Sequence, residues 1–468
     1  MDCFLRGMFK MHENDTIAAI STPIGVGAIG MVRLSGPGSI AVAGAIFKAK
    51  NNKPAELLKS HTVSYGTIVN AEEIVDEVLL AVMKAPNTYT GEDIVEINCH
   101  GGIMCVRLVL EAALKNGARI AEPGEFTKRA FLNGRMDLYK AEAVIDVINA
   151  ETTAQHKIAA GQLEGGANNV FRATRDELLA LIAQIEAAID YPEDDIEPLT
   201  LKTIRETVEG QIRKLEDLLS TFEQGKIIKE GLKTTILGPP NVGKSSLLNA
   251  LSGENRAIVT NIPGTTRDIL EENLSIGGVP IKLTDTAGIR NTEDVVEKIG
   301  VDRAMKTAET ADLVLLVLDS SEQLLSEEVK LLKFCSDKKT IVILNKTDLP
   351  QKIDSNMVSE FISEKYVVEI SLKSGLGLGN LTQVIKNMFF GGEVSFGANT
   401  LTNVRHKILV EDALFSLKSA IATIEDALPE DFISIDLQAA YKKLGEILGE
   451  DLNEDFIDEM FARFCLGK

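Results

Sequence analysis

The chain has few cysteines, no tryptophan and no long apolar run. Its five cysteines are odd in number and scattered, which excludes the disulfide framework of a small secreted protein. No apolar run approaches the roughly 20 residues that a membrane helix needs, so we predict no membrane span. The stretch before Asp15 lacks the apolar core of a signal peptide, and Met11 is an alternative first residue. We therefore expect a cytoplasmic protein.

A basic surplus is also missing. The 69 acidic residues outnumber the 49 basic ones, and the formal net charge is −20. This excludes a protein that wraps nucleic acid by bulk electrostatics, because phosphate contacts need clustered lysine and arginine. Local RNA binding through a small basic surface or through a partner stays open. The length of 468 residues predicts about three domains.

Three short patterns suggest sites that their context does not support. Cys99, His100 and Cys105 lie close together but lack the paired spacing of zinc ligands, so buried or loop residues are favoured. Gly25-Val-Gly-Ala-Ile-Gly30 matches a dinucleotide motif, but a strand-like run follows instead of a helix, which predicts a turn between strands. For the acidic stretch 186–197, a solvated helix end is favoured over a metal site.

Apolar periodicity divides the chain into segments. Strands and helices alternate over residues 15–130, helical spacing follows, and strand–helix alternation returns after a junction at residues 224 and 225. Neither helical flank can bury its apolar stripe alone, so we expect a discontinuous all-α domain with an inserted sheet domain. The predicted class is multidomain α/β with four segments: an N-terminal α+β domain over 1–133, a first helical segment over 134–225, a Ras-like P-loop domain over 226–390 and a second helical segment over 391–468.

One stretch gives the clearest indication of a binding site. Gly238-Pro-Pro-Asn-Val-Gly-Lys-Ser245 fits the phosphate-loop pattern and stands between a predicted strand and a predicted helix. Backbone N–H groups there can surround a polyphosphate. Lys244 would reach the β- and γ-phosphates, and Ser245 would place a hydroxyl on Mg²⁺. The alternative is a glycine-rich turn before a helix.

Further motifs follow in the order that a GTPase requires. Asp285-Thr-Ala-Gly288 can hold Mg²⁺ through water and contact the γ-phosphate. In Asn345-Lys-Thr-Asp348, the Asp348 carboxylate can accept both N–H donors of guanine, which adenine lacks. Ser371-Leu-Lys373 can support the base from its other side, although it departs from the usual Ser-Ala.

The segment between the first two motifs contains a threonine pair. Thr266 is our choice for completing the Mg²⁺ shell, with Thr265 beside it. Ile289 stands where Ras-like GTPases have a water-positioning Gln, so a bound cation, an acid such as Glu297, or a partner protein must act instead. The predicted GTP-binding residues are Asn241, Val242, Gly243, Lys244, Ser245, Ser246, Thr260, Asn261, Ile262, Pro263, Gly264, Thr265, Thr266, Asp285, Thr286, Ala287, Gly288, Asn345, Lys346, Asp348, Ser371, Leu372 and Lys373.

Several stretches outside the GTPase motifs are also distinctive. They are Asp15-Thr-Ile17, Gly30-Met-Val-Arg-Leu-Ser-Gly36, Tyr89-Thr-Gly-Glu-Asp93, His100-Gly-Gly102, Pro123-Gly-Glu-Phe126, Ala130-Phe-Leu-Asn133, Asp137-Leu138, Asp190-Tyr-Pro192 and Phe464-Cys-Leu-Gly-Lys468. Together with the GTPase motifs, they make the chain resemble the MnmE (TrmE) family of tRNA-modification GTPases nearly end to end. The resemblance implies a folate-binding N-terminal domain, a homodimer, and a complex with the FAD-dependent partner MnmG (GidA). Together they would modify C5 of the wobble uridine of certain tRNAs, with a one-carbon unit from 5-formyl- or 5,10-methylene-tetrahydrofolate.

The resemblance also implies roles for single residues. Potassium would stand in for an arginine finger, and Glu297 would orient water through a second water, with a surface acid as the alternative for Glu297. As a free thiol in the tail, Cys465 could act as a nucleophile or proton donor near the folate, and a packed structural thiol is the alternative. Cys99 departs from the family, which usually has Gly there. The implied K⁺ ligands are Asn241, Thr260, Ile262 and Thr265, and the implied folate contacts are Arg33, Glu96, Arg135 and Lys468.

A second function class is compatible with the GTPase core. A regulatory GTPase that binds ribosomes or a membrane surface would need the same motifs. Such assembly GTPases usually append a basic RNA-binding module. This chain instead appends an acidic helical frame and the Phe-Cys-Leu-Gly-Lys tail, which favours the tRNA-modifying class.

Overall fold

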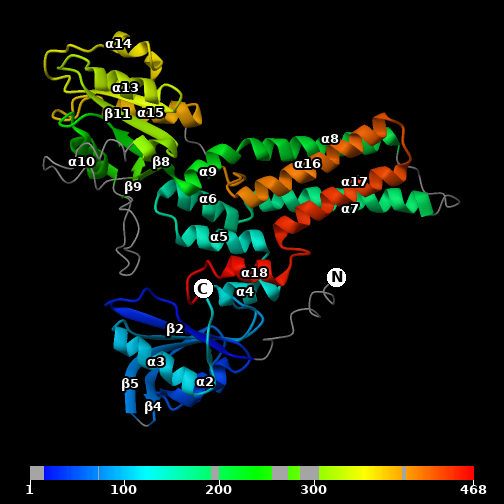
Figure 1. Ribbon diagram of the computed structural model, residues 1–468. Helices are drawn as coiled ribbons and strands as arrows, with labels where there is room; N and C mark the ends of the chain where they lie inside the picture. The colour runs from blue at the N-terminus through cyan, green and yellow to red at the C-terminus, as the bar shows by residue number, and fades with distance from the viewer. Residues whose placement is uncertain (1–14, 72, 191–199, 256–271, 285–304, 393–396) are drawn as a thin grey trace. The chain divides into compact units, whose positions relative to one another are not determined.

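The computed structural model describes residues 15–71, 73–190, 200–255, 272–284, 305–392 and 397–468 (Figure 1). It divides into two compact units. The first contains residues 1–145 and 448–468, and the second contains residues 146–447. Within the described ranges, no helix is both long and apolar enough to cross a membrane.

The first unit is built on a seven-stranded sheet in the order β3-β4-β5-β6-β2-β1-β7. Neighbouring strands are antiparallel except β1 and β7, which are parallel. The strands are β1 (Ile17–Ile20), β2 (Ile29–Ser35), β3 (Phe47–Ala49), β4 (Thr62–Asn70), β5 (Glu73–Met83), β6 (Ile94–His100) and β7 (Arg119–Ile120).

Two helices cover one face of this sheet. Helices α2 (Ser39–Ile46) and α3 (Ile103–Lys115) pack their apolar side chains on alternate strand residues such as Val32 and Ile97, which are fully buried. Alternation in a strand sends successive side chains to opposite faces, so Arg33 and Glu96 point to the other face. That other face carries a small apolar cluster that includes Phe126.

Helices from both ends of the chain complete the first unit. Helices α4 (Glu125–Leu132) and α18 (Glu454–Phe461) are in contact, and α5 (Leu138–Ile148) follows α4 (Figure 1). Leu138, Phe461 and Phe464 share one buried cluster. The C-terminal residues therefore belong to the same compact unit as the N-terminal sheet.

The second unit contains a six-stranded sheet in the order β13-β12-β11-β8-β10-β9. All neighbouring pairs are parallel except β9 and β10. The strands are β8 (Leu232–Leu237), β9 (Glu272–Ile276), β10 (Val279–Leu283), β11 (Leu313–Asp319), β12 (Thr340–Asn345) and β13 (Val367–Glu369), and the helices around them are α10 (Lys244–Asn255), α13 (Ser326–Cys335), α14 (Ser355–Ser359) and α15 (Leu378–Phe390).

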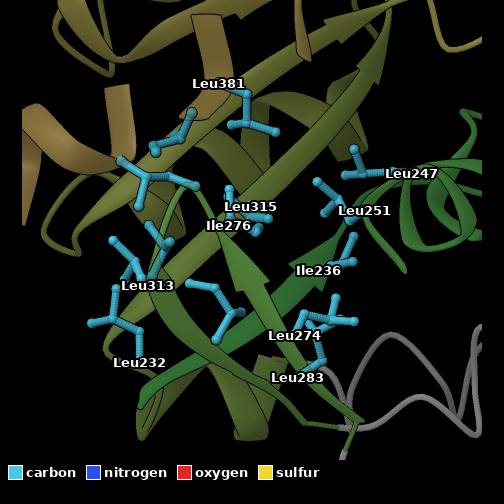
Figure 2. Close-up of a cluster of buried hydrophobic side chains, with 14 of the residues drawn as sticks. Leu232, Ile236, Leu247, Leu251, Leu274, Ile276, Leu283, Leu313, Leu315 and Leu381 are labelled. Carbon is cyan, nitrogen blue, oxygen red and sulfur yellow. The ribbon is translucent and has the colours of Figure 1, made fainter. Parts of the chain in front are cut away.

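Both faces of this sheet are buried. Leu315 joins a cluster with Leu247 and Leu251 of α10 and Leu381 of α15 (Figure 2), whereas its neighbour Leu316 joins another cluster with α13. Such two-sided burial explains why β11 and β12 read as continuous apolar runs. The doubly wound α/β arrangement predicted from strand–helix alternation is confirmed.

Helices that precede this sheet in the chain pack on helices that follow it. Helix α8 (Leu201–Ser220) contacts both α7 (Gly166–Asp190) and α16 (Val404–Glu425), and Arg205 of α8 pairs with Glu425 of α16 at 2.8 Å. A helical frame built from both sides of the inserted sheet is therefore present in the second unit (Figure 1). Residues 134–145 and 448–468, which we expected in the helical segments, lie instead in the first unit. The remaining helices of this frame are α6 (Thr153–Leu163), α9 (Phe222–Glu230) and α17 (Glu430–Leu448).

Some local predictions differ from the structure. The expected junction at residues 224 and 225 lies inside α9, so a helix and not a loop leads toward β8. Strand β4 was not predicted, because Gly66 interrupts its pattern. A Cβ at Gly66 would approach the carbonyl oxygen of Lys48 to 2.4 Å, so the site requires glycine. The turn predicted at Gly25–Gly30 is confirmed for residues 25–28, which lie between the antiparallel strands β1 and β2, whereas Ile29 and Gly30 already belong to β2.

Candidate functional site

The phosphate loop leaves β8 at the carboxyl edge of the parallel sheet, where ligands bind in doubly wound folds. Gly238 has φ 146°, and a Cβ there would lie 2.3 Å from the carbonyl oxygen of Val317. Asn241 has φ 63° and is exposed. The Lys244 ammonium donates to the carbonyl oxygen of Gly238 at 2.8 Å, so it lies over the loop, and Ser245 follows in the first turn of α10.

Asn345 ties this loop to the end of β12. Its side-chain amide donates to the carbonyl oxygen of Val242 at 2.8 Å, and its side-chain oxygen accepts from the backbone N–H of Leu372 at 3.2 Å. Gly243 has φ 106°, and a Cβ there would lie 2.3 Å from the Asn345 amide nitrogen. One buried side chain thus holds three loops at fixed spacing.

The predicted guanine-reading carboxylate is oriented by a serine. The Ser371 hydroxyl donates to Asp348 at 2.8 Å, and it accepts from the backbone N–H of Ser374 at 3.3 Å. Asp348 and Lys373 are exposed, whereas Ser371 is buried. The buried Ser371 hydroxyl therefore orients the Asp348 carboxylate, which remains exposed to solvent, as base recognition would require.

A further acid at this edge was missed from the sequence. Asp319 ends β11, and its carboxylate lies 2.5 Å from the ammonium of Lys346, which has φ 67°. Burial acts to raise the pKa of Asp319, but hydrogen bonds from Lys346 and Ser321 outweigh it and leave the pKa lowered. The sequence did offer a signal for Asp319, because it is a polar residue at the end of an apolar strand. The carboxyl ends of parallel strands meet at the edge of the sheet where ligands bind.

The structure describes only some of the remaining predicted nucleotide-binding residues. Ser246 is exposed in α10. The expected water-orienting acid, the threonine pair and the Asp-x-x-Gly motif lie outside the described residues. These residues are Thr260, Asn261, Ile262, Pro263, Gly264, Thr265, Thr266, Asp285, Thr286, Ala287, Gly288 and Glu297.

A second polar site lies on the face of the first sheet that α2 and α3 do not cover. Arg33 and Glu96 are register partners on β2 and β6, and their side chains pair at 2.8 Å. The Gly467 carbonyl oxygen accepts from Arg33 at 3.4 Å and from the Ser21 hydroxyl at 3.1 Å. Burial and the nearby Arg33 charge lower the pKa of Lys468. Three of the four predicted folate residues therefore come together.

The fourth predicted folate residue contacts a neighbouring segment. Arg135 donates to the carbonyl oxygen of Thr88 at 2.9 Å, and no described contact joins it to Arg33. The Arg33 guanidinium lies 6.0 Å from the ring centre of Tyr89 and 5.8 Å from that of Phe126. These two aromatic residues were missed, since they lie far from Arg33 in the sequence.

The C-terminal tail is held by its backbone while its thiol is free. The Gly124 N–H donates to the carbonyl oxygen of Cys465 at 3.3 Å, but the Cys465 side chain is an exposed free thiol. Of the two alternatives for this residue, exposure agrees with the free thiol and not with the packed one.

A phosphate loop and a guanine motif joined at the carboxyl edge of a mostly parallel sheet define a P-loop GTPase domain. A family model described as "GTP-binding protein TrmE N-terminus" matches residues 16–135, and one described as "MnmE helical domain" matches residues 138–465. The chain belongs to the MnmE (TrmE) family.

Curated relatives match the chain along nearly its whole length. The "tRNA modification GTPase MnmE" of Geobacillus kaustophilus is 51% identical over 98% of this chain and 100% of the relative. The protein of the same description from Bacillus subtilis is 50% identical over 97% of this chain and 100% of the relative. The solved G domain of the T. maritima FeoB iron transporter is 32% identical over 34% of this chain and 98% of that one, with a TM-score of 0.25, and the family assignment does not depend on it.

Proposed function

We propose that this protein is a K⁺-dependent GTPase that modifies C5 of the wobble uridine of certain tRNAs together with an FAD-dependent MnmG partner. The carrying observation is the full-length match to relatives described as tRNA modification GTPases, at about half identity. The Asn345–Val242 hydrogen bond, which places a guanine motif against a phosphate loop, supports the GTPase activity. We also propose that the chain divides into four segments, with boundaries after residues 133, 225 and 390.

In this proposal GTP binds with Mg²⁺ at the carboxyl edge of the second sheet. Lys244 neutralises the β- and γ-phosphates, while Ser245 and Thr266 ligate Mg²⁺. Asp348, oriented by Ser371, accepts both donors of the guanine edge. What supports the assignment is that the exposed carboxylate and the phosphate loop share one rigid frame through Asn345.

Potassium would supply the positive charge that no arginine finger provides. Asn241 is exposed at the turn of the loop, where its side-chain oxygen can ligate a cation, and Thr260, Ile262 and Thr265 would complete the shell. GTP turnover should be many-fold faster in KCl than in NaCl, and Asn241→Ala should remove the difference. The matched control is Asn249→Ala, an exposed asparagine of α10. Equal rates in both salts with the wild type contradict the potassium mechanism.

The tetrahydrofolate derivative would bind at Arg33, Glu96 and Lys468, with Arg135 nearby. A carboxylate can accept from the amino-pterin edge, and cationic side chains suit the glutamate tail. Titration with 5-formyltetrahydrofolate should show binding to the wild type and its loss in Glu96→Ala. Glu77→Ala, which removes an exposed ion pair elsewhere on the sheet, should bind normally. If the wild type does not bind, the folate assignment fails.

The cellular function has a direct test. Mass spectrometry of tRNA nucleosides from a deletion strain should show unmodified wobble uridines, restored by the wild-type gene. Restoration should fail with Lys244→Ala and should depend on the flavoprotein partner, and light scattering should show a homodimer. Unchanged wobble uridines in the deletion strain would contradict tRNA modification and favour a regulatory GTPase.

A further inference from the structure

Four side chains with metal-ligating atoms gather in the first unit, where β5, β6 and α3 meet. They are Asp76, Cys99, His100 and Cys105. One ligand atom each from Asp76, Cys99 and Cys105 lie within 4.8 Å of one another. The His100 Nδ1 lies 2.7 Å from one carboxylate oxygen of Asp76.

Asp76 is an unusual residue for its position. It continues the alternation of Val78 and Leu80, which face the apolar core, and its side chain is only 12% exposed. Among the described residues, no lysine or arginine pairs with it. Its oxygens instead accept from the backbone N–H of His100 at 2.7 Å and from the Cys105 thiol at 2.9 Å. Hydrogen bonds hold this largely buried carboxylate in place, and a bound metal ion would neutralise its charge.

The two thiols lie on the same side of the carboxylate. Cys99 is 4% exposed, and its Sγ donates to the carbonyl oxygen of Gly30 at 3.4 Å. Cys105 is in the first turn of α3 and is half-buried. Both reach the cluster from rigid elements, one strand and one helix, so little ordering is needed on metal binding.

We propose that Asp76, Cys99 and Cys105 bind a zinc ion, with His100 as the fourth ligand. Two thiolates, one carboxylate and one imidazole are a donor set that suits Zn²⁺. Zn–S and Zn–O bonds of usual length place tetrahedral ligands about 3.5–3.8 Å apart, which is within the spread of these atoms. His100 closes the shell by rotating its exposed ring, already in contact with Asp76.

This site is separate from the proposed folate site. Cys99 belongs to the core between the sheet and α2 and α3, whereas Glu96, three residues earlier on β6, points to the opposite face. The zinc ion would join β5, β6 and α3, so its role is to stabilise the N-terminal unit. Metal binding is coupled to thiol deprotonation, so the Cys105 proton now donated to Asp76 would be released.

The test uses the full-length chain and zinc itself. After dialysis against buffer without chelator, the wild type should retain one zinc per chain by elemental analysis. Addition of Co²⁺ to the metal-free wild type should give thiolate-to-cobalt charge-transfer absorption and raise the melting temperature. This spectrum reports thiol ligation without any mutation.

Matched variants separate this cluster from the other thiols. Cys3→Ser/Cys335→Ser/Cys465→Ser leaves only Cys99 and Cys105 and should keep both the zinc and the cobalt spectrum. Cys99→Ser/Cys105→Ser should lose both, and Asp76→Asn should weaken zinc binding. The proposal is overturned if the wild type binds no zinc, if the triple variant loses it, or if Cys99 and Cys105 form a disulfide in place of metal binding.

Discussion

The side-chain amide of Asn345 donates a buried hydrogen bond of 2.8 Å to the backbone carbonyl oxygen of Val242. This bond joins the end of β12 to the phosphate loop that follows β8. The two segments are 103 residues apart in the chain. The sheet brings the phosphate-binding loop and the base-reading loop to the same edge, and this amide links them directly.

We expect Asn345→Ala to weaken nucleotide binding and the GTPase domain together. The change removes the partner of the buried Val242 carbonyl, which costs about 1–3 kcal/mol, and it also removes the acceptor of the half-buried Leu372 N–H. Fluorescent-GDP titration and urea unfolding measure the two effects. An Asn345→Ala protein with wild-type affinity and stability would show that the bond is dispensable.

Gly243→Ala should cause a comparable loss of binding for a steric reason. The new Cβ would lie 2.3 Å from the Asn345 amide nitrogen at φ 106°, and backbone strain of this kind costs about 1–3 kcal/mol. Gly253→Ala is the matched control, because nothing lies within 4 Å of a Cβ there and alanine favours helix by about 0.5–1 kcal/mol. Equal affinities for the two variants would contradict the clash.

Asp348→Asn should change which base is bound. Hydrogen bonds to a charged group contribute about 1.5–3 kcal/mol, so GTP affinity should fall roughly 10- to 100-fold. A xanthine nucleotide, which carries an oxygen in place of the exocyclic amine, should bind the variant better than GTP. Competition titration with both nucleotides measures the exchange. If the variant still prefers GTP, Asp348 does not read the guanine edge.

Gly467→Ala should release the C-terminal tail from the first unit. Gly467 has φ 84°, and a Cβ would approach the carbonyl oxygen of Ile20 to 2.4 Å. The amide of Gly124, which donates to Cys465, should then lose hydrogen-exchange protection. Gly25→Ala, in an open loop position, is the control and should leave that amide protected. Full protection in Gly467→Ala would mean that the tail tolerates a side chain.

Acid should destabilise the GTPase domain in part through Asp319. Its pKa in the folded protein is below the ordinary value of 3.8, so its ionised form stabilises the fold above that pH and the stabilisation is lost as the pH falls further. Asp319→Asn should be less stable than the wild type at neutral pH and should show a shallower loss below pH 3.8. Urea unfolding over a pH series measures the slopes, and exposed Asp337→Asn should behave as the wild type. Parallel slopes for all three proteins would remove Asp319 from the acid response.

Local patterns in the sequence predict much of the fold. The apolar, β-branched stretches at residues 74–83 and 340–344 predict the strands β5 and β12, because such residues suit a pleated, buried surface. Strand β4 is hard to predict because it contains Gly66, and a glycine usually indicates a turn. Here glycine is required because the backbone of Lys48 lies close to it.

Contacts between distant segments are where the sequence is less informative. The motif around Asn345 predicts a guanine loop, but its bond to Val242 depends on strand order in the sheet. Asp76 lies on β5, whereas Cys99 lies on β6 and Cys105 in α3, so the spacing of the thiols alone argues against a metal site. The pairing of β5 with β6 adds the carboxylate that the sequence spacing does not show. The pairing of Arg33 with Gly467 likewise follows from no local pattern.

The hydrogen bond from Ser21 to Gly467 spans 446 residues of the chain. A ribosome that adds about 5–20 residues per second makes residues 136–453 over roughly 15–60 s. During that interval the sheet of the first unit exists without Phe461 and Phe464, which share a buried cluster with Leu138. We therefore expect Leu138 to lack its C-terminal packing partners while that part of the chain is made, and we expect the nascent N-terminal unit to expose an apolar surface to which chaperones can bind.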